Sequence, residues 1–160
     1  MLRLKAVNGK NIWKLLELSV DDSQKEFVAS NDISIIEAYT AITAHGYAFP
    51  FGIYDDDVPV GFLMIGFDKD DYWDDAPEIA TGNYNLWRLM IDKNYQHRGY
   101  GRQAVKLALD YIRTFPCGQA QYCWLSYEPE NQVAKELYAS YGFKETGDMD
   151  GEEIIAVLKL

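Results

Sequence analysis

The order of apolar and polar residues along the chain predicts strands interspersed with helices. Alternating or uninterrupted apolar runs of four to ten residues are typical of half-buried and fully buried strands. Two pairs of runs are joined by short turns, at Asp55–Asp57 and at Asp150-Gly151, and are therefore expected to form antiparallel hairpins. The strands are expected at residues 2–7, 47–54, 58–67, 85–91, 121–127, 143–149 and 152–160.

Apolar residues spaced three and four positions apart predict helices between these strands. The helices are expected at residues 11–18, from Asn31 or Asp32 to just before Gly46, at 99–115 and at 131–141. In the second helix, a stripe of Ile35, Ile36, Tyr39 and Ile42 is expected to face the core. The polar stretch 21–30 shows no clear pattern, and residues 68–82 are expected to form a loop.

The strand, helix and strand within residues 85–127 are expected to form a crossover with two parallel strands, because parallel neighbours need such a connection. The flanking hairpins are antiparallel, so the prediction is an α/β fold with a mixed sheet and helices on its faces. A chain of 160 residues is long enough to bury roughly two thirds of its extended surface as one domain, residues 1–160.

Composition excludes several classes of protein. Hydrophobic residues make up 48% of the chain, which argues against disorder, and no apolar run is long enough to span a membrane. The N-terminus has no secretory signal pattern, so a cytoplasmic protein is expected. Cys117 and Cys123 are expected to be buried free thiols, and no metal site is expected, since two thiols and two distant histidines do not supply a ligand set.

The net charge is −10, which argues against a nucleic-acid partner and suits a cationic small molecule. The acidic residues gather at Asp55–Asp57, interpreted as a solvated hairpin tip, and at residues 68–78. The second group includes Asp74, Asp75 and Glu78 beside aromatic residues. Either it binds a cation or it is only a solvated loop, and the sequence leaves both interpretations open.

The chemistry of the chain is expected around the segment NLWRLMIDKNYQHRGYGR, residues 85–102. An apolar strand leads into a turn with glycines at 99 and 101, and a helix begins there. The first N–H groups of a helix have no partner within it and favour negative charge. Arg98 and Arg102 add positive charge. The pattern therefore suits a phosphorylated ligand, although a glycine pair also occurs in ordinary turns.

The Q-x-x-G-x-G pattern of residues 96–101 after an apolar strand resembles the acetyl-CoA-binding motif of the GNAT acetyltransferases. Asn131, Leu137-Tyr138 and Tyr141-Gly142-Phe143 are similar to the next block of that superfamily, in order and spacing. The resemblance extends over the whole chain. Within the superfamily, the chain is most similar to the bacterial spermine/spermidine acetyltransferases.

The resemblance implies a GNAT fold of about 6–7 strands and about 4 helices, in which a bulge splays the two parallel central strands. It implies acetyl-CoA as cosubstrate, with the pantetheine arm on the main chain of β-strand residues 89–91 and the pyrophosphate on the turn. The cofactor-binding residues implied are Leu89, Met90, Ile91, Gln96, His97, Arg98, Gly99, Tyr100, Gly101, Arg102, Asn131 and Lys135. Asn131 also stands where a helix N-cap belongs, and both roles are compatible.

Tyr138 is the catalytic residue implied by the resemblance. Without it, a tyrosine on an apolar helical stripe is more often part of the core. A phenol beside the thioester sulfur protonates the departing thiolate as a general acid. The amine must attack in its neutral form, and alkylamines with a pKa near ~10.4 are neutral in only about one molecule in a thousand at pH 7. The enzyme therefore needs a proton acceptor, a water route or a desolvated slot that lowers the amine pKa, and Glu78 and Glu128 are candidate acceptors.

The predicted acceptor is a polyamine, spermine or spermidine, acetylated by direct attack in a ternary complex. Asp74, Asp75, Glu78 and Trp87 are the candidate substrate-binding residues, because carboxylates and aromatic faces both attract ammonium groups. The alternatives are another amine, such as a protein N-terminus, an amino acid or an amine antibiotic, and a non-catalytic acyl-CoA sensor. Dimers are frequent among similar proteins, so a homodimer stays open.

Overall fold

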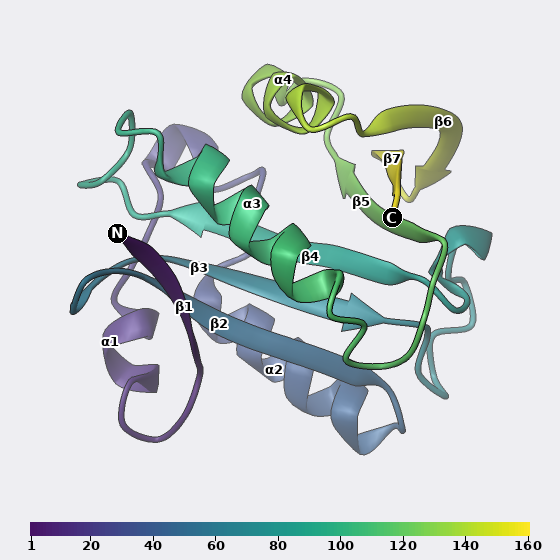
Figure 1. Ribbon diagram of the computed structural model, residues 1–160, viewed down its shortest axis with the longest axis horizontal. Coiled ribbons are helices and arrows are strands. Elements are labelled where there is room, and N and C mark those ends of the chain that lie inside the picture. The colour runs from purple at the N-terminus through teal and green to yellow at the C-terminus, as the bar shows by residue number, and fades with distance from the viewer.

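Seven strands form one mixed sheet in the order β1-β2-β3-β4-β5-β7-β6 in the computed structural model, which describes residues 1–160 (Figure 1). Every neighbouring pair is antiparallel except β4 and β5, which are parallel. The strands are β1 Leu2–Ala6, β2 Tyr47–Asp55, β3 Val58–Phe67, β4 Tyr84–Ile91, β5 Tyr122–Tyr127, β6 Lys144–Asp150 and β7 Glu153–Lys159. The predicted α/β class and mixed sheet are confirmed.

Helices cover both faces of the sheet, with α3 on one face and α2 on the other (Figure 1). The α-helices are α1 Ile12–Leu16, α2 Asn31–Thr43, α3 Tyr100–Ile112 and α4 Gln132–Ser140, and short 3₁₀ turns lie at Asp22–Gln24 and Glu78–Ala80. All four predicted helices are present. None of them combines the length and the apolar character that a membrane span requires.

The core follows from the alternation along the central strands. Leu63 and Ile65 of β3 are buried with residues of α3 such as Val105 and Ile112. Phe62 and Met64 point to the opposite face and pack with Ala38 of α2. Because both faces of β3 are covered, the strand is an almost uninterrupted apolar run, which explains why its bounds were readable from the sequence.

Of the stripe predicted to bury α2, only Ile35 packs against the core, and the other three residues were predicted wrongly. Ile36, Tyr39 and Ile42 are 58%, 69% and 54% exposed. The buried residues of the helix are Asn31, Ser34, Ala38 and Ala41. The sheet face beneath already carries Phe62 and Met64, so small side chains let the helix approach closely. The N-cap is Ser30, not Asn31 or Asp32, and it makes no capping hydrogen bond through its side chain.

Two features of the sheet position the site. In β4, Arg88 pairs with Met64 and Leu86 pairs with Ile65, so Trp87 is the extra residue of a β-bulge. In the C-terminal hairpin, Asp150 pairs with Glu153, so the turn is Gly151-Glu152, displaced by one residue from the predicted Asp150-Gly151. The displacement places two carboxylates side by side at the end of the hairpin.

Both cysteines are free thiols, as predicted. Cys123 is fully buried on β5, and burial raises the pKa of its thiol to about 12. Cys117 is half-buried in the connection after α3.

Candidate active site

A large cavity opens where β4 and β5 diverge. The two strands pair only at Tyr84 with Cys123 and at Asn85 with Trp124, so β4 residues beyond Asn85 have β3 as their only partner strand. The predicted splay is thereby confirmed. The cavity has a volume of about 1200 Å³. That volume suits a long ligand, and backbone groups left without a partner strand suit a ligand that binds as an added strand.

The turn before α3 has the geometry of an anion site. His97 and Gly99 both have left-handed backbones, with φ of 62° and 77°. Gly99 is the N-cap of α3, and no side chain caps the first turn. A Cβ on Gly99 would meet no atom within 4 Å, so space lies beside the free N–H groups. His97, Gly99, Tyr100 and Gly101 all line the cavity. These residues fit a pyrophosphate at the helix N-terminus.

Gln96 acts through its side chain. Its Nε2 donates to the Ile91 carbonyl at 3.0 Å and to Gln24 Oε1 at 2.8 Å. Leu89, Met90 and Ile91 all line the cavity, as expected, and the Ile91 carbonyl already accepts one hydrogen bond from Gln96. Gln96 therefore joins β4, the cofactor turn and the segment between α1 and α2.

Three predicted cofactor cations lie outside the cavity lining. Arg98 is exposed, donates to the Asn94 carbonyl at 3.3 Å and lies 5.4 Å from the Tyr95 ring. Arg102 is also exposed, with its guanidinium 5.8 Å from the Tyr141 ring. Lys135 pairs with Glu145 at 3.4 Å. The two arginines flank the turn from the solvent side, whereas Lys135 is engaged away from it.

Helix α4 contributes the predicted asparagine and tyrosine. Asn131 is the N-cap of α4, and its Oδ1 accepts from the Ala134 N–H at 3.2 Å; its side chain lines the cavity as well. Tyr138 stacks on Tyr127, with ring centroids 6.2 Å apart, and meets Phe143 edge-on at 5.8 Å. Burial strongly raises the pKa of the Tyr138 phenol, so it stays protonated. Its hydroxyl has no hydrogen-bond partner in the chain, which leaves it available to a ligand.

The opposite end of the cavity is acidic and aromatic. Trp87 lines it, as predicted, but Asp74, Asp75 and Glu78 do not; the same loop instead contributes Asp70, Tyr72 and Trp73. The ionisable residues that line this end are Glu37, Asp70, Arg88, Glu128, Glu130, Asp150 and Glu153. Arg88 is held by Glu37, with Nη2 and Oε2 2.7 Å apart. The remaining carboxylates have no paired cation.

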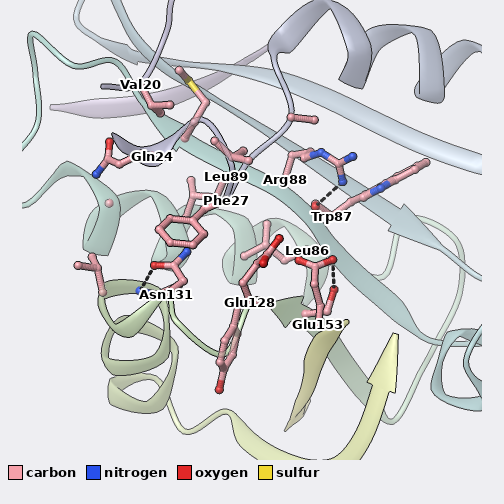
Figure 2. A pocket seen from close by; sticks show the side chains of 18 of the residues that line it. Val20, Gln24, Phe27, Leu86, Trp87, Arg88, Leu89, Glu128, Asn131 and Glu153 are labelled. Carbon is pink, nitrogen blue, oxygen red and sulfur yellow. Dashed lines mark hydrogen bonds between the residues drawn. The ribbon is translucent and has the colours of Figure 1, made fainter. Parts of the chain in front are cut away.

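Several lining residues were not predicted. Phe27 comes from the pattern-free stretch 21–30, and Figure 2 shows its ring beside Asn131. Just before that stretch, the Ser19 N–H donates at 3.0 Å to the carboxylate of Asp92, the residue that follows β4. Asp150 and Glu153 were hidden by the one-residue displacement of the turn. Glu37 and Arg88 lie 51 residues apart, and no local pattern relates them.

An ion pair attaches the loop of residues 68–82 to the turn that follows α2. His45 Nδ1 lies 2.6 Å from Asp71 Oδ2, and this carboxylate raises the pKa of His45 above 6.5. We expect the His45 ring to titrate at higher pH in the protein than in Asp71→Asn, as measured by NMR. A pKa raised in the folded state means that the pair stabilises the fold below pH about 6.5 and loses its effect as pH rises through the folded-state pKa. Identical midpoints in both proteins would contradict the pairing.

Comparisons with known proteins agree with this geometry. The acetyltransferase (GNAT) family profile matches residues 12–143. The chain is 29% identical over 161 residues to a probable spermine N(1)-acetyltransferase of Bacillus subtilis subsp. natto (strain BEST195), covering 96% of both. It is also 29% identical, with the same coverage, to the spermine/spermidine N(1)-acetyltransferase of Bacillus subtilis (strain 168).

Solved structures share the fold. PaiA N-acetyltransferase from Thermoplasma acidophilum, in complex with coenzyme A, superposes with a TM-score of 0.68 at 16% identity, covering 100% of this chain and 99% of that one. Aminoglycoside acetyltransferase AAC(6')-Ib with coenzyme A gives 0.76 at 14% identity, covering 99% and 95%. These likenesses concern the fold alone. Together with the family match, the splayed strands and the helix-terminal turn, they show that this chain belongs to the GNAT acetyltransferase family and is an acetyl-CoA-dependent N-acetyltransferase.

Proposed function

We propose that the chain, as one domain of residues 1–160, acetylates a primary amine of a polyamine such as spermine or spermidine. The observation that carries the proposal is the charge of the acceptor end. Glu37, Glu128, Asp150 and Glu153 are among the seven acidic residues that line the cavity, whereas its only lysine and arginine, Lys25 and Arg88, are already paired with Asp22 and Glu37. A ligand with several positive charges neutralises such a cavity, whereas a neutral or anionic acceptor leaves its carboxylates uncompensated.

Aromatic side chains provide the second part of the proposed polyamine site. Trp73 stacks on Trp124 with ring centroids 6.2 Å apart, and Tyr72, Trp73, Trp87 and Trp124 all line the cavity. Methylene groups between ammonium centres pack on such faces, and the ammonium groups gain cation–π attraction. The curated relatives named for spermine and spermidine, similar over 96% of their length, support the same acceptor class.

The proposed mechanism is direct transfer. Acetyl-CoA, when bound, supplies the acetyl thioester. The N–H groups at the start of α3 hold its diphosphate, and the splayed edge of β4 orients its arm. The acceptor end holds the amine on the opposite side of the thioester. Tyr138 keeps its phenol proton because burial raises its pKa, and it donates that proton to the departing sulfur.

A panel of acceptors tests the substrate class. We expect spermidine and spermine to give kcat/KM values at least about tenfold above those for butylamine, kanamycin and a dipeptide, because each additional matched charge adds about 1 kcal/mol or more of attraction near a protein surface. Coenzyme A release is the measurement. The KM for spermidine is expected to rise between about 0.05 M and about 0.5 M salt, and the KM for butylamine to rise less.

Two results would remove the polyamine assignment. The first is faster turnover of kanamycin or the dipeptide than of either polyamine. The second is a spermidine KM that does not respond to salt. Binding of acetyl-CoA without turnover of any amine would instead favour the non-catalytic alternative.

A further inference from the structure

Glu153 lies at the point where the central strands separate. The antiparallel strands β5 and β7 pair Tyr127 with Ile154. Glu128, which follows Tyr127, therefore lies opposite Glu153, which precedes Ile154. Figure 2 shows both carboxylates pointing toward Leu86 of β4, across the opening between the strands. Glu153 lines the cavity and is half-buried. It thus occupies the gap that an acceptor must enter to reach a thioester lying on β4.

The Glu153 carboxylate is oriented but not neutralised. The hydroxyl of Ser126 on β5 donates to Glu153 Oε2 at 3.4 Å. The charged groups facing it are Glu128 after β5, Asp150 at the end of β6 and Arg88 on β4. Arg88 is engaged by Glu37 of α2, so no cation pairs directly with Glu153. Burial, Asp150 and Glu128 raise the pKa of Glu153, and Arg88 opposes them.

A second polar group without a partner lies on β5, close in sequence to Ser126. Trp124, two residues before Ser126 on β5, is 2% exposed and lines the same cavity. Its indole Nε1–H is buried and has no hydrogen-bond partner. Buried donors in native proteins are almost always satisfied, so a bound molecule or an ordered water is expected beside it.

We propose that Glu153 is the general base of the acetyl transfer. The incoming ammonium group, R–NH₃⁺, gives one proton to the Glu153 carboxylate, and the neutral nitrogen attacks the thioester carbonyl carbon. The C–N bond forms and the C–S bond breaks. The sulfur takes the Tyr138 phenol proton, the second nitrogen proton restores that phenol, and Glu153 releases its proton to water. The sum is amide, thiol and one proton.

Glu153 suits this role better than the neighbouring carboxylates. Asp150 pairs with Glu153 across the hairpin, but burial and the charge of Asp75 raise its pKa, and no residue of β4 is among the charges that act on it. Glu128 has no hydrogen bond that orients its carboxylate. Glu153 alone combines an orienting hydroxyl with proximity to Arg88, the residue next to the β4 bulge. We therefore assign Asp150 and Glu128 to holding the acceptor's positive charge.

The test is a pH profile of Glu153→Gln. At pH 7 we expect kcat to fall by about 10²-fold, the usual scale for loss of a general base. The deficit is expected to shrink to less than about tenfold near pH 9.5, where more than about a tenth of an alkylamine is already neutral. The wild-type kcat/KM is expected to fall at acid pH with a midpoint above the ordinary glutamate value of about 4.3, and this limb is expected to disappear in the variant.

Matched variants separate catalysis from charge and folding. Glu152→Gln changes the exposed neighbour, which does not line the cavity, and is expected to behave as wild type. Glu153→Asp is expected to retain part of the activity and the acid limb. Glu128→Gln and Asp150→Asn are expected to raise the KM for spermidine more than they lower kcat. Acetyl-CoA affinity, measured by calorimetry, is expected to be unchanged in Glu153→Gln.

The proposal rests on acetyl transfer and not on the polyamine assignment. The pH profile is measured with spermidine or, where spermidine is not turned over, with the fastest amine of the panel. Failure of the polyamine assignment can thus be distinguished from failure of the assignment of the base. Glu153→Gln with a kcat within about twofold of wild type, or with a loss of the same size at every pH, overturns the assignment of the base.

Discussion

Replacement of Tyr138 by phenylalanine is expected to lower kcat by about 10²-fold or more, which corresponds to about 2.7 kcal/mol of transition-state stabilisation. The ring still stacks on Tyr127 and Phe143, so the fold and acetyl-CoA affinity are expected to persist. Only the hydroxyl is lost, and it has no partner within the chain. Without a proton donor, the sulfur must leave as a thiolate. Steady-state coenzyme A release and calorimetry measure the two quantities.

Tyr141→Phe is the matched control, three residues further along the chain. Its hydroxyl donates to the Arg102 carbonyl at 2.6 Å, so its removal is expected to cost about 1 kcal/mol of stability and to change kcat by less than about threefold. Unchanged turnover in Tyr138→Phe would make the phenol structural. A loss of acetyl-CoA binding in parallel with kcat would also contradict an acid that acts only in the chemical step.

Gly61→Ala is expected to lower stability and to weaken acetyl-CoA binding together. A Cβ at Gly61 would lie 2.4 Å from the Met90 carbonyl oxygen and 3.0 Å from Ile91 Cδ1. Backbone atoms cannot move aside as a flexible side chain does, so β3 and β4 must separate at this point. Overpacking of this kind costs about 1–3 kcal/mol, which lowers the melting temperature by roughly 3–10 °C in a chain of this size.

Gly61→Ala is expected to affect acetyl-CoA binding as well as stability, because Met90 and Ile91 lie on the cavity wall. We expect the dissociation constant of acetyl-CoA to rise by about tenfold, since misplacement of one wall costs about 1.4 kcal/mol or more of binding. Gly66→Ala on the same strand is the control: its nearest neighbour, Trp87 Cε3, would lie at 3.4 Å, an ordinary contact. Equal effects of the two substitutions on melting and binding would refute the close approach at Gly61.

Much of the fold was predictable because the central elements depend on local patterns. The apolar run of β3 begins and ends at the predicted residues, Val58 and Phe67, since burial on both faces leaves no polar interruption. The orientation of α2 was not predictable. Its inward face is set by the large side chains of β3 beneath it, which are not visible in the helix's own sequence, and tertiary packing outweighed the apparent stripe.

The site divides in the same way. The turn proposed to bind the cofactor was predictable because one short segment supplies its strand, glycines and helix start. The acceptor end was not, because it combines residues from distant elements: Glu37 from α2, Arg88 from the β4 bulge and Glu153 from β7. The predicted acidic loop does line the cavity, but through Asp70, Tyr72 and Trp73 instead of Asp74, Asp75 and Glu78. Because the hairpin turn was predicted one residue too early, the pairing of Asp150 with Glu153 was not predicted.

β4 and β5 pair at only two positions, so the sheet has two parts, β1–β4 and β5–β7, connected by little strand pairing. The turn proposed to hold the diphosphate lies in the N-terminal part, whereas four of the six carboxylates at the acceptor end, Glu128, Glu130, Asp150 and Glu153, lie in the C-terminal part. Substitutions in the C-terminal hairpin are therefore expected to alter which amine binds without changing the residues proposed to contact the nucleotide. A fold divided in this way allows amine preference to diverge while the shared acyl donor is retained.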